Sequence, residues 1–185
     1  EAFASADVAI EFTAPHVAYD NCIQAMEAGV KVVSGSTGWF QQHEAEMREK
    51  CEKEGKTLFW SSNFSLGVAI FAAVNKYLAR IMSNFDNYKV GIEETHHIHK
   101  LDAPSGTALS LAKEINLVKD NSLFNAFDRS KGKRGQSEIG FHSIRGGTVS
   151  GKHSVMFLGN GESITLTHEA ESKDIFACGA LKAVE

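Results

Sequence analysis

The first third of the chain alternates short apolar runs with longer amphipathic segments. Three apolar runs predict strands, at residues 8–12, 30–33 and 57–60. The segments between them predict two helices, one from Pro15 to Gly29 with a single apolar face and a charged one over 44–54. This order of strands and helices is typical of a parallel sheet flanked by helices.

A long segment at 66–82 predicts a helix that is apolar on nearly every face, with Ser65 in position to cap it. Such a helix is expected to be buried on several sides, as at a junction between two layers or domains.

The pattern changes from Tyr88 onward to an alternation of apolar and polar residues, which predicts half-buried strands. These strands are expected at 88–93, 138–145, 153–158 and 162–170. A helix after Pro104 presents one apolar face, made of Ala108, Leu111, Ala112 and Ile115. The second half is therefore expected to be an α+β unit with a mostly antiparallel or mixed sheet, followed by a final helix from 175.

Residues 117–137 form a polar stretch with a basic cluster, at Arg129, Lys131, Lys133 and Arg134. We expect a solvated loop here, and a binding patch is the alternative.

Composition narrows the classes of partner. The net charge of −4 over 185 residues does not favour nucleic acid or an anionic membrane. No run of apolar residues is long enough to span a membrane, and no signal peptide opens the chain. Three widely spaced cysteines, at 22, 51 and 178, form no C-x-x-C pair and are expected to be reduced thiols. We therefore expect a cytoplasmic protein.

Residues 94–108 carry the most specific chemistry of the chain. Three histidines and Lys100 fall within five positions, followed by the Ser105-Gly106-Thr107 turn and an apolar helix pattern. Imidazole and ammonium groups can donate protons and attract anions. A turn that opens a helix presents free backbone N–H groups to an anion. The segment predicts a site that donates protons and binds carboxylates.

Two other interpretations of this segment are less favoured. His96, His97 and His99 could bind a metal, but adjacent strand residues point to opposite faces and Lys100 would repel the ion. Ser105 could be a nucleophile, but it lacks the G-x-S-x-G elbow of such enzymes.

Two loops follow strands of the predicted parallel sheet. Gly35-Ser36-Thr37-Gly38 follows the second strand, and Ser61-Ser62-Asn63-Phe64 follows the third. Ligands of such sheets bind at the carboxyl ends of the strands. Alone, each loop is equally compatible with an ordinary turn.

Together these pieces resemble one family. The segment E-T-H-H-I-H-K-L-D-A-P-S-G-T-A at 94–108 matches the signature E-x-H-H-x-x-K-x-D-x-P-S-G-T-A of 4-hydroxy-tetrahydrodipicolinate reductase, also called dihydrodipicolinate reductase, at every fixed position. The two loops resemble the family's G-T-T-G and A-x-N-F-S-x-G-V segments, in the same order.

The resemblance implies reduction of a cyclic dicarboxylated imine by NADH or NADPH, in the diaminopimelate route to lysine. It makes His96 the proton donor or the immediate partner of the donor, and Lys100 the second acid. It makes His97, Gly106 and Thr107 substrate-binding residues. The nicotinamide end of the cofactor would contact the residues of the two loops: Gly35, Ser36, Thr37, Ser61, Ser62, Asn63 and Phe64.

The resemblance also implies an architecture. Residues 1–64 would be part of a Rossmann-like dinucleotide-binding domain, 65–174 a substrate-binding and tetramerisation domain, and 175–185 the start of a returning helix. A homotetramer would assemble through the second-half sheet. We expected its apolar side chains to be the contact surface, because the helix at 108–115 alone is short: Ile139, Phe141, Val155, Phe157, Ile164 and Leu166.

The chain departs from the family in two ways. Ser36 replaces a threonine, which keeps the hydroxyl. The family's G-x-x-G-x-M-G turn, which holds the cofactor pyrophosphate, is missing from the sequence. We therefore expect a piece of the enzyme, without the first strand–helix units. The alternative to a reductase is a fragment that folds and oligomerises but binds no dinucleotide.

Overall fold

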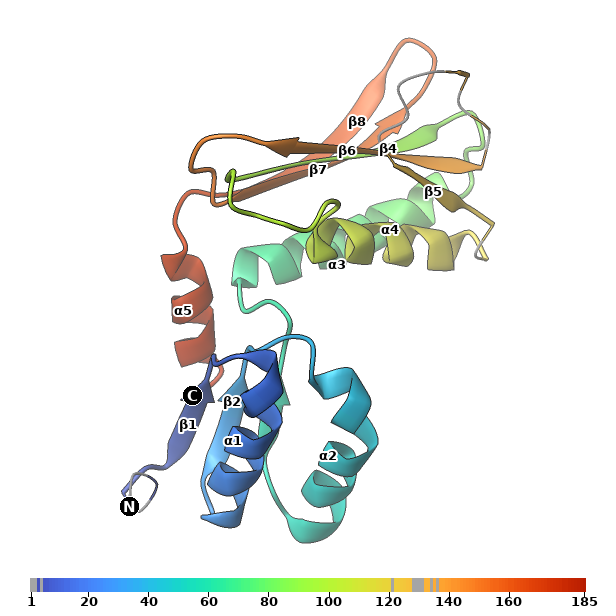
Figure 1. Cartoon of the computed structure of the whole chain (residues 1–185). Helices are drawn as coiled ribbons and strands as arrows, with labels where there is room; N and C mark the ends of the chain where they lie inside the picture. Colours follow the sequence, from blue (N-terminus) through green and yellow to red (C-terminus); the bar gives the residue numbers. More distant parts are fainter. Residues whose placement is uncertain (1–2, 4, 121, 128–131, 134, 136) are drawn as a thin grey trace. The chain divides into compact units, whose positions relative to one another are not determined.

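The chain folds into two compact units. The computed structural model describes residues 3, 5–120, 122–127, 132–133, 135 and 137–185. One unit comprises Glu1–Leu66 with Asp174–Glu185, and the other comprises Gly67–Lys173 (Figure 1).

The first unit contains a parallel sheet in the order β1-β2-β3. Its elements are β1 (Val8–Glu11), α1 (Pro15–Glu27), β2 (Lys31–Ser34), α2 (Phe40–Glu54), β3 (Leu58–Trp60) and α5 (Asp174–Lys182). The predicted strand–helix order is confirmed. Helix α2 begins at Phe40 rather than at 44, because its first turn is held by apolar contacts: the Phe40 ring stacks on Trp60 with 4.4 Å between ring centroids.

Each face of this parallel sheet has its own core. Cys22, Met26 and Met47 from α1 and α2 pack with Val32 of β2. In a second, separate cluster, Ala180 of α5 packs with Val33 and Phe64. A Cβ atom on Gly179 would lie 1.6 Å from the carbonyl oxygen of Phe64, so only glycine permits this close approach.

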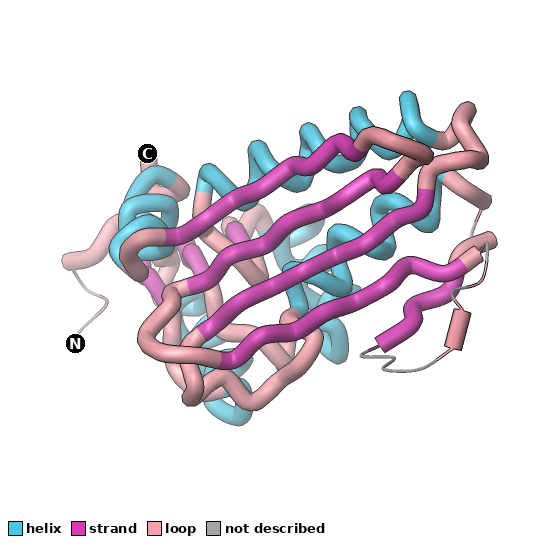
Figure 2. The backbone as a smooth tube through the Cα atoms, turned by 90° about the horizontal axis from the view of Figure 1, so that it is seen from above, coloured by secondary structure: helices cyan, strands magenta, loops and turns pink. Residues whose placement is uncertain are grey.

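The second unit is a mixed sheet of five strands in the order β5-β6-β4-β7-β8 (Figure 2). Its elements are α3 (Leu66–Met82), β4 (Lys89–His96), α4 (Gly106–Val118), β5 (Phe124–Phe127), β6 (Glu138–Arg145), β7 (Gly151–Leu158) and β8 (Ser163–Ala170). Strand β6 runs parallel to β4 and β5, whereas β7 runs antiparallel to both of its neighbours. The predicted mixed sheet is confirmed.

Helices α3 and α4 cover the same face of this sheet (Figure 1). The four residues predicted for the apolar face of α4 are all buried. They pack with Phe71 and Ala79 of α3 against Ile92, Phe141 and Val155 of the sheet. This layer is the hydrophobic core of the second unit.

The prediction for α3 is wrong in one respect. Only one side of the helix is buried, where Phe71, Asn75, Ala79 and Met82 face the core. Leu66, Ile70, Val74, Tyr77 and Ile81 are exposed, by 42 to 68%. High apolar content indicated burial, but the sheet reaches the helix from one side only.

The expected contact surface of the sheet is wrong for four of its six residues. Ile139, Phe141, Val155 and Phe157 lie under the two helices and are at most 3% exposed. The opposite face carries mainly polar and small residues, among them Glu93, Thr165 and Thr167, with Met156 and Leu158 between them. Two helices rather than one cover the apolar face, so these four side chains are not available for assembly. On the edge strand β8, Ile164 is 41% exposed and Leu166 half-buried, and both stay candidates for a contact surface.

Part of the polar stretch at 117–137 is regular secondary structure rather than the predicted loop. It contains the end of α4 and the edge strand β5, which pairs with β6. Of the predicted basic cluster, Lys133 is exposed, and Arg129, Lys131 and Arg134 lie outside the described residues. Among the described helices, none has the length and apolarity to cross a membrane.

Candidate active site

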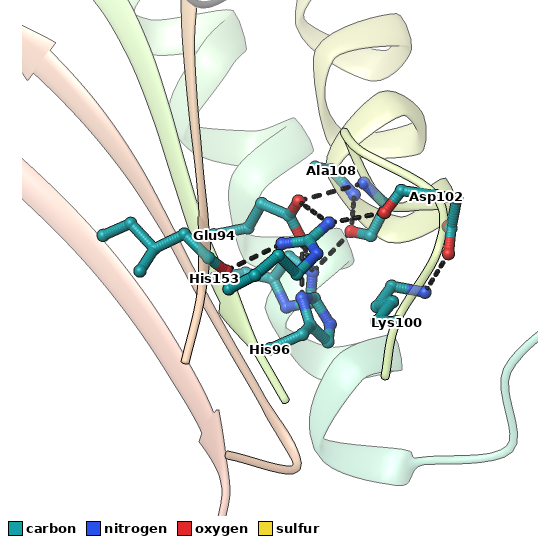
Figure 3. A network of polar contacts seen from close by, with 9 residues as sticks. Glu94, His96, Lys100, Asp102, Ala108 and His153 are labelled. Carbon is teal, nitrogen blue, oxygen red and sulfur yellow. Dashed lines mark hydrogen bonds and ion pairs between the residues drawn. The ribbon is translucent and has the colours of Figure 1, made fainter. Parts of the chain in front are cut away.

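Three neighbouring strands of the second unit bring four ionisable side chains together. Glu94 and His96 lie two residues apart on β4 and therefore face the same side of the sheet. Arg145 of β6 is paired with His96, and His153 of β7 is paired with Glu94. Figure 3 shows the resulting network.

Glu94 is the centre of this network, and its side chain is fully buried. Its Oε1 atom accepts hydrogen bonds from Arg145 Nη2 at 2.7 Å and from the backbone N–H of Ser105 at 3.2 Å. Burial alone would raise the pKa of Glu94, but hydrogen bonds from Arg145, Ser105 and Ser143 lower it below its usual value. The carboxylate is therefore ionised at neutral pH.

His96 contacts the other oxygen of the same carboxylate. Its Nδ1 atom lies 2.6 Å from Glu94 Oε2, an ion-pair distance without hydrogen-bond alignment, and among the described residues neither atom makes a hydrogen bond. Burial lowers the pKa of His96, and although the Glu94 charge opposes this, Lys100 and Arg145 add to it. Without a ligand, His96 is mainly neutral at pH 7.

His153 is held neutral beside this pair. Its Nε2 atom lies 2.9 Å from the hydroxyl oxygen of Ser105 and 3.9 Å from Glu94 Oε2. Burial, with the nearby His96, lowers the pKa of His153 to about 4.

The N-terminus of α4 lies next to the network. Ser105 is its N-cap: the side-chain oxygen accepts a hydrogen bond from the backbone N–H of Ala108, and the carbonyl accepts one from Leu109. Gly106 and Thr107 are the first residues of the helix, and their N–H groups precede the regular helical hydrogen bonds. Gly106 is exposed and Thr107 half-buried, so an anion can approach this turn.

Lys100 meets this helix end through Asp102. Its Nζ atom lies 2.7 Å from Asp102 Oδ1, and the Gly106 N–H also donates to that carboxylate. Burial would raise the pKa of Asp102, but the bond and charge of Lys100 and the Gly106 N–H lower it. Lys100, predicted as the second acid, and Gly106, predicted to bind substrate, thus already hold a carboxylate.

His97 occupies the turn after β4, apart from the Glu94 network. Its Nδ1 atom is buried and lacks a hydrogen-bonding partner among the described residues. Partial burial lowers the pKa of His97, and the positive charge of Lys173 lowers it further. His97 and Lys173 therefore add polar and cationic character to this end of the sheet.

A metal interpretation of the network is weaker than a hydrogen-bonded one. The three residues whose ligand atoms converge are Glu94, His96 and His153, not the three histidines considered from the sequence. Two ligands of a tetrahedral zinc ion lie roughly 3.3 Å apart, given bonds of about 2.0–2.2 Å. The 2.6 Å contact between Glu94 and His96 suits an ion pair with a protonated Nδ1 instead.

Sequence reasoning missed Glu94, Arg145 and His153 as members of the site. Glu94 belongs to the matched signature but had no role assigned to it. His153 gave a usable signal, because it shares the core-facing side of its strand with Val155 and Phe157. Arg145 gave none, since the pairing of β6 with β4 is not visible in the sequence.

In the first unit, the two predicted cofactor loops lie at the same edge of the parallel sheet. They follow β2 and β3, and they are joined by hydrogen bonds from Trp60 Nε1 to the Ser36 carbonyl at 2.9 Å and from Ser61 N–H to the Ser34 carbonyl at 3.2 Å. The arrangement matches the expected ligand edge of such a sheet.

Several side chains of these loops point inward. The Ser36 hydroxyl is buried 2.8 Å from Glu11 Oε1, and Ser61 and Asn63 bond within their own loop. Phe64 is buried in the core. Thr37, Gly38 and Ser62 are exposed, and Gly35, Ser61 and Asn63 are half-buried.

An aromatic surface lies beside these loops. The Phe12 ring covers Gly35, where a Cβ atom would come within 2.2 Å of it. Phe12 and Phe59 each lie within 5.7 Å of Phe64 and are about half exposed. Exposed rings beside open backbone fit a flat heteroaromatic group such as nicotinamide.

Comparison with known proteins agrees with this geometry. Residues 1–64 match the family described as "Dihydrodipicolinate reductase, N-terminus", and residues 67–185 match "Dihydrodipicolinate reductase, C-terminus". The N-terminal region of this family binds NADH or NADPH.

Individual relatives give the same result. The 4-hydroxy-tetrahydrodipicolinate reductase of Archaeoglobus fulgidus is 44% identical over 184 residues, covering 97% of this chain and 69% of the relative. The enzyme of Christiangramia forsetii is 40% identical over 179 residues, which cover 97% of this chain and 73% of that relative.

A solved structure is also similar. The dipicolinate-bound dihydrodipicolinate reductase of Paenisporosarcina superposes with a TM-score of 0.74 at 25% identity, covering 96% of this chain and 67% of that one. On the sequence matches and the shared fold, the chain belongs to the dihydrodipicolinate reductase family.

Proposed function

We propose that this chain carries the substrate site of an enzyme that reduces 4-hydroxy-tetrahydrodipicolinate to tetrahydrodipicolinate, in the diaminopimelate route to lysine. The observation that supports this most strongly is the grouping of His96, Lys100 and the exposed N-terminus of α4 in one unit. This grouping offers a proton donor beside groups that bind carboxylates.

Substrate binding is assigned to four residues. Lys100 and the N–H groups of Gly106 and Thr107 would hold one carboxylate, as Lys100 and Gly106 now hold Asp102. His97 would contact the substrate from the turn after β4. The similar Paenisporosarcina structure contains dipicolinate, a flat pyridine dicarboxylate, which supports a dicarboxylate ligand.

The proton step is assigned to His96, with Lys100 as the second acid. The bound NADH or NADPH supplies the hydride. Reduction of a conjugated C=N system leaves electron density on the substrate, which a positioned acid must protonate. Glu94 stabilises the protonated form of His96, and a bound dianion would do so further.

Cofactor binding is assigned to the two loops of the first unit. Thr37, the 36–38 backbone and the loop at 61–64 would contact the nicotinamide end, whereas Gly35 lies beneath the Phe12 ring. Ser36 and Phe64 would support these loops from below rather than touch the cofactor with their side chains.

The test of this function is kinetic and uses the full-length protein. His96→Gln and Lys100→Ala should each lower kcat by roughly 10²- to 10⁴-fold, the span for loss of a positioned acid. His97→Ala should act mainly on KM. Near-parental kcat at saturating substrate in both His96 and Lys100 variants would refute the assignment of the acids.

We further propose a cytoplasmic homotetramer. All three cysteines are free thiols, as suits a reducing compartment. The helix-free face of the five-stranded sheet is the surface available for assembly (Figure 2). Sedimentation of the full-length protein at tens of micromolar tests this, and a monomer would contradict it.

The alternative is a non-catalytic module that folds and assembles without binding the dinucleotide. The absence of a G-x-x-G-x-M-G turn from the 185 residues favours it, because the two pyrophosphate charges rely on such a turn. Calorimetric titration of this chain with NADH tests the module, because micromolar binding or measurable turnover would exclude it. A reductase activity of the full-length protein would exclude it as well.

A further inference from the structure

Glu94 touches both parts of the candidate active site. One oxygen contacts His96, and the other accepts the backbone N–H of Ser105, the cap of α4. We propose that Glu94 is a positioning residue, which fixes the tautomer of His96 and holds the α4 N-terminus in register with it. This inference rests on the proposed role of His96 as proton donor.

The contact with Glu94 decides which nitrogen of the His96 ring carries the proton. Nδ1 lies 2.6 Å from an ionised carboxylate oxygen. An unprotonated Nδ1 would repel that oxygen at this distance, so Nδ1 carries the proton. The opposite nitrogen, Nε2, is then the atom that exchanges a proton with a ligand. A Cβ atom at position 151 would lie 3.1 Å from Nε2, so Gly151 leaves that edge of the ring uncovered.

The Glu94 carboxylate is itself held in place by Arg145. Arg145 Nη2 donates to Glu94 Oε1 at 2.7 Å, and its guanidinium also donates to the carbonyl of Asp102. A planar guanidinium held at two points leaves the carboxylate little freedom to rotate. Glu94 Oε2 therefore stays directed at His96.

Glu94 also holds the N-terminus of α4. The same Oε1 atom accepts the Ser105 N–H, and the Ser105 hydroxyl contacts His153 and caps Ala108. Movement of Glu94 would shift both the proton donor and the turn that presents Gly106 and Thr107. The distance between acid and carboxylate site is thus set by one side chain.

The charged and titratable groups around His96 are few. From β4 and its turn these are Glu94 and Lys100, from β6 Arg145, and from β7 His153. Glu94 is the single anion of this set. Its removal leaves His96 among cations and a neutral histidine, so His96 should then bind its proton less strongly.

The first experiment measures His96 by nitrogen-edited NMR on this chain. In the unchanged chain, the neutral ring should be the tautomer with the proton on Nδ1. In Glu94→Gln, the His96 titration midpoint should fall by about one pH unit or more. Glu114→Gln, which removes a carboxylate paired with Lys76 at 3.2 Å on α4, is the matched control and should leave it unchanged.

Two results would overturn the inference: a neutral His96 with its proton on Nε2 in the unchanged chain, or an unaltered midpoint in Glu94→Gln. The first needs no variant, so it applies even if Glu94→Gln fails to fold. A complementary assay on the full-length enzyme should show lower kcat, an acid-shifted pH optimum and a higher substrate KM for Glu94→Gln. A near-parental kcat of His96→Gln would instead contradict the proposed function, and the NMR result would still hold.

Discussion

At the scale of single residues, the candidate site is an arrangement of protons around one buried carboxylate. Glu94 is ionised, His153 is neutral, and His96 has a lowered pKa despite its contact with Glu94. His96, Lys100, Gly106 and Thr107 could be predicted because they lie in one contiguous segment. Arg145 and His153 could not, since they reach the site through the pairing of β6 and β7 with β4.

Ligand binding should therefore be coupled to protonation. In the chain without ligand, burial lowers the pKa of His96 below 6.5, and a bound dianion should raise this pKa. Between the two values, binding of dipicolinate takes up a proton, so affinity should fall as pH rises through this window, by up to about tenfold per pH unit. Calorimetry in buffers of different ionisation enthalpy measures the uptake. Proton release, or none at any pH from 5 to 8, would contradict it.

Asp102 should compete with the substrate. Its carboxylate now binds Lys100 and the Gly106 N–H, which a substrate carboxylate would need. Asp102→Asn should tighten dipicolinate binding by about three- to tenfold, because a neutral amide holds the lysine less strongly. Asp86→Asn, which removes an exposed partner of Lys119, is the control. Weaker binding in Asp102→Asn would show that Asp102 orients Lys100 instead.

At the scale of helices, strands and loops, periodicity predicted position better than burial. The apolar face of α4 was predicted residue by residue, because its spacing leaves one possible core side. The burial of α3 was not, since its apolar residues lie all round and only contact with the sheet selects a side. Strand β5 was missed because four residues within a polar stretch give no alternation.

One loop depends on a buried carboxylate of its own. Glu11 of β1 is 6% exposed and accepts hydrogen bonds from Ser34 at 2.6 Å and from Ser36 and the Thr13 N–H at 2.8 and 2.7 Å. Burial would raise its pKa, but these bonds lower it below 4.5. Glu11→Gln should therefore reduce the unfolding free energy by about 2 kcal/mol at pH 7.

The pH dependence of this loss has a fixed sign. A carboxylate with a lowered folded pKa stabilises the protein above its unfolded pKa, and the effect is lost as pH falls through the folded value. The difference between the unchanged chain and Glu11→Gln should shrink below about pH 4.5. Urea unfolding across pH measures this, with exposed Glu46→Gln as control. A constant difference down to pH 3 would exclude an ionised Glu11 as the cause.

At the scale of the whole molecule, the chain consists of two units with separate cores and separate candidate roles. The α/β class and the order of the two sheets could be predicted, because parallel and mixed sheets differ in their hydrophobic pattern. Which face of the second sheet is open could not, because it depends on two helices packing side by side on the other face.

We expect the segment around Lys100 and the α4 N-terminus to bind a dicarboxylate. NMR titration of this chain with dipicolinate tests this binding most directly. We predict saturable shifts concentrated at the amides of Gly106 and Thr107 and at the rings of His96 and His97, which Lys100→Ala should weaken at least about tenfold. No shift at millimolar dipicolinate, or shifts confined to other parts of the chain, would contradict the account.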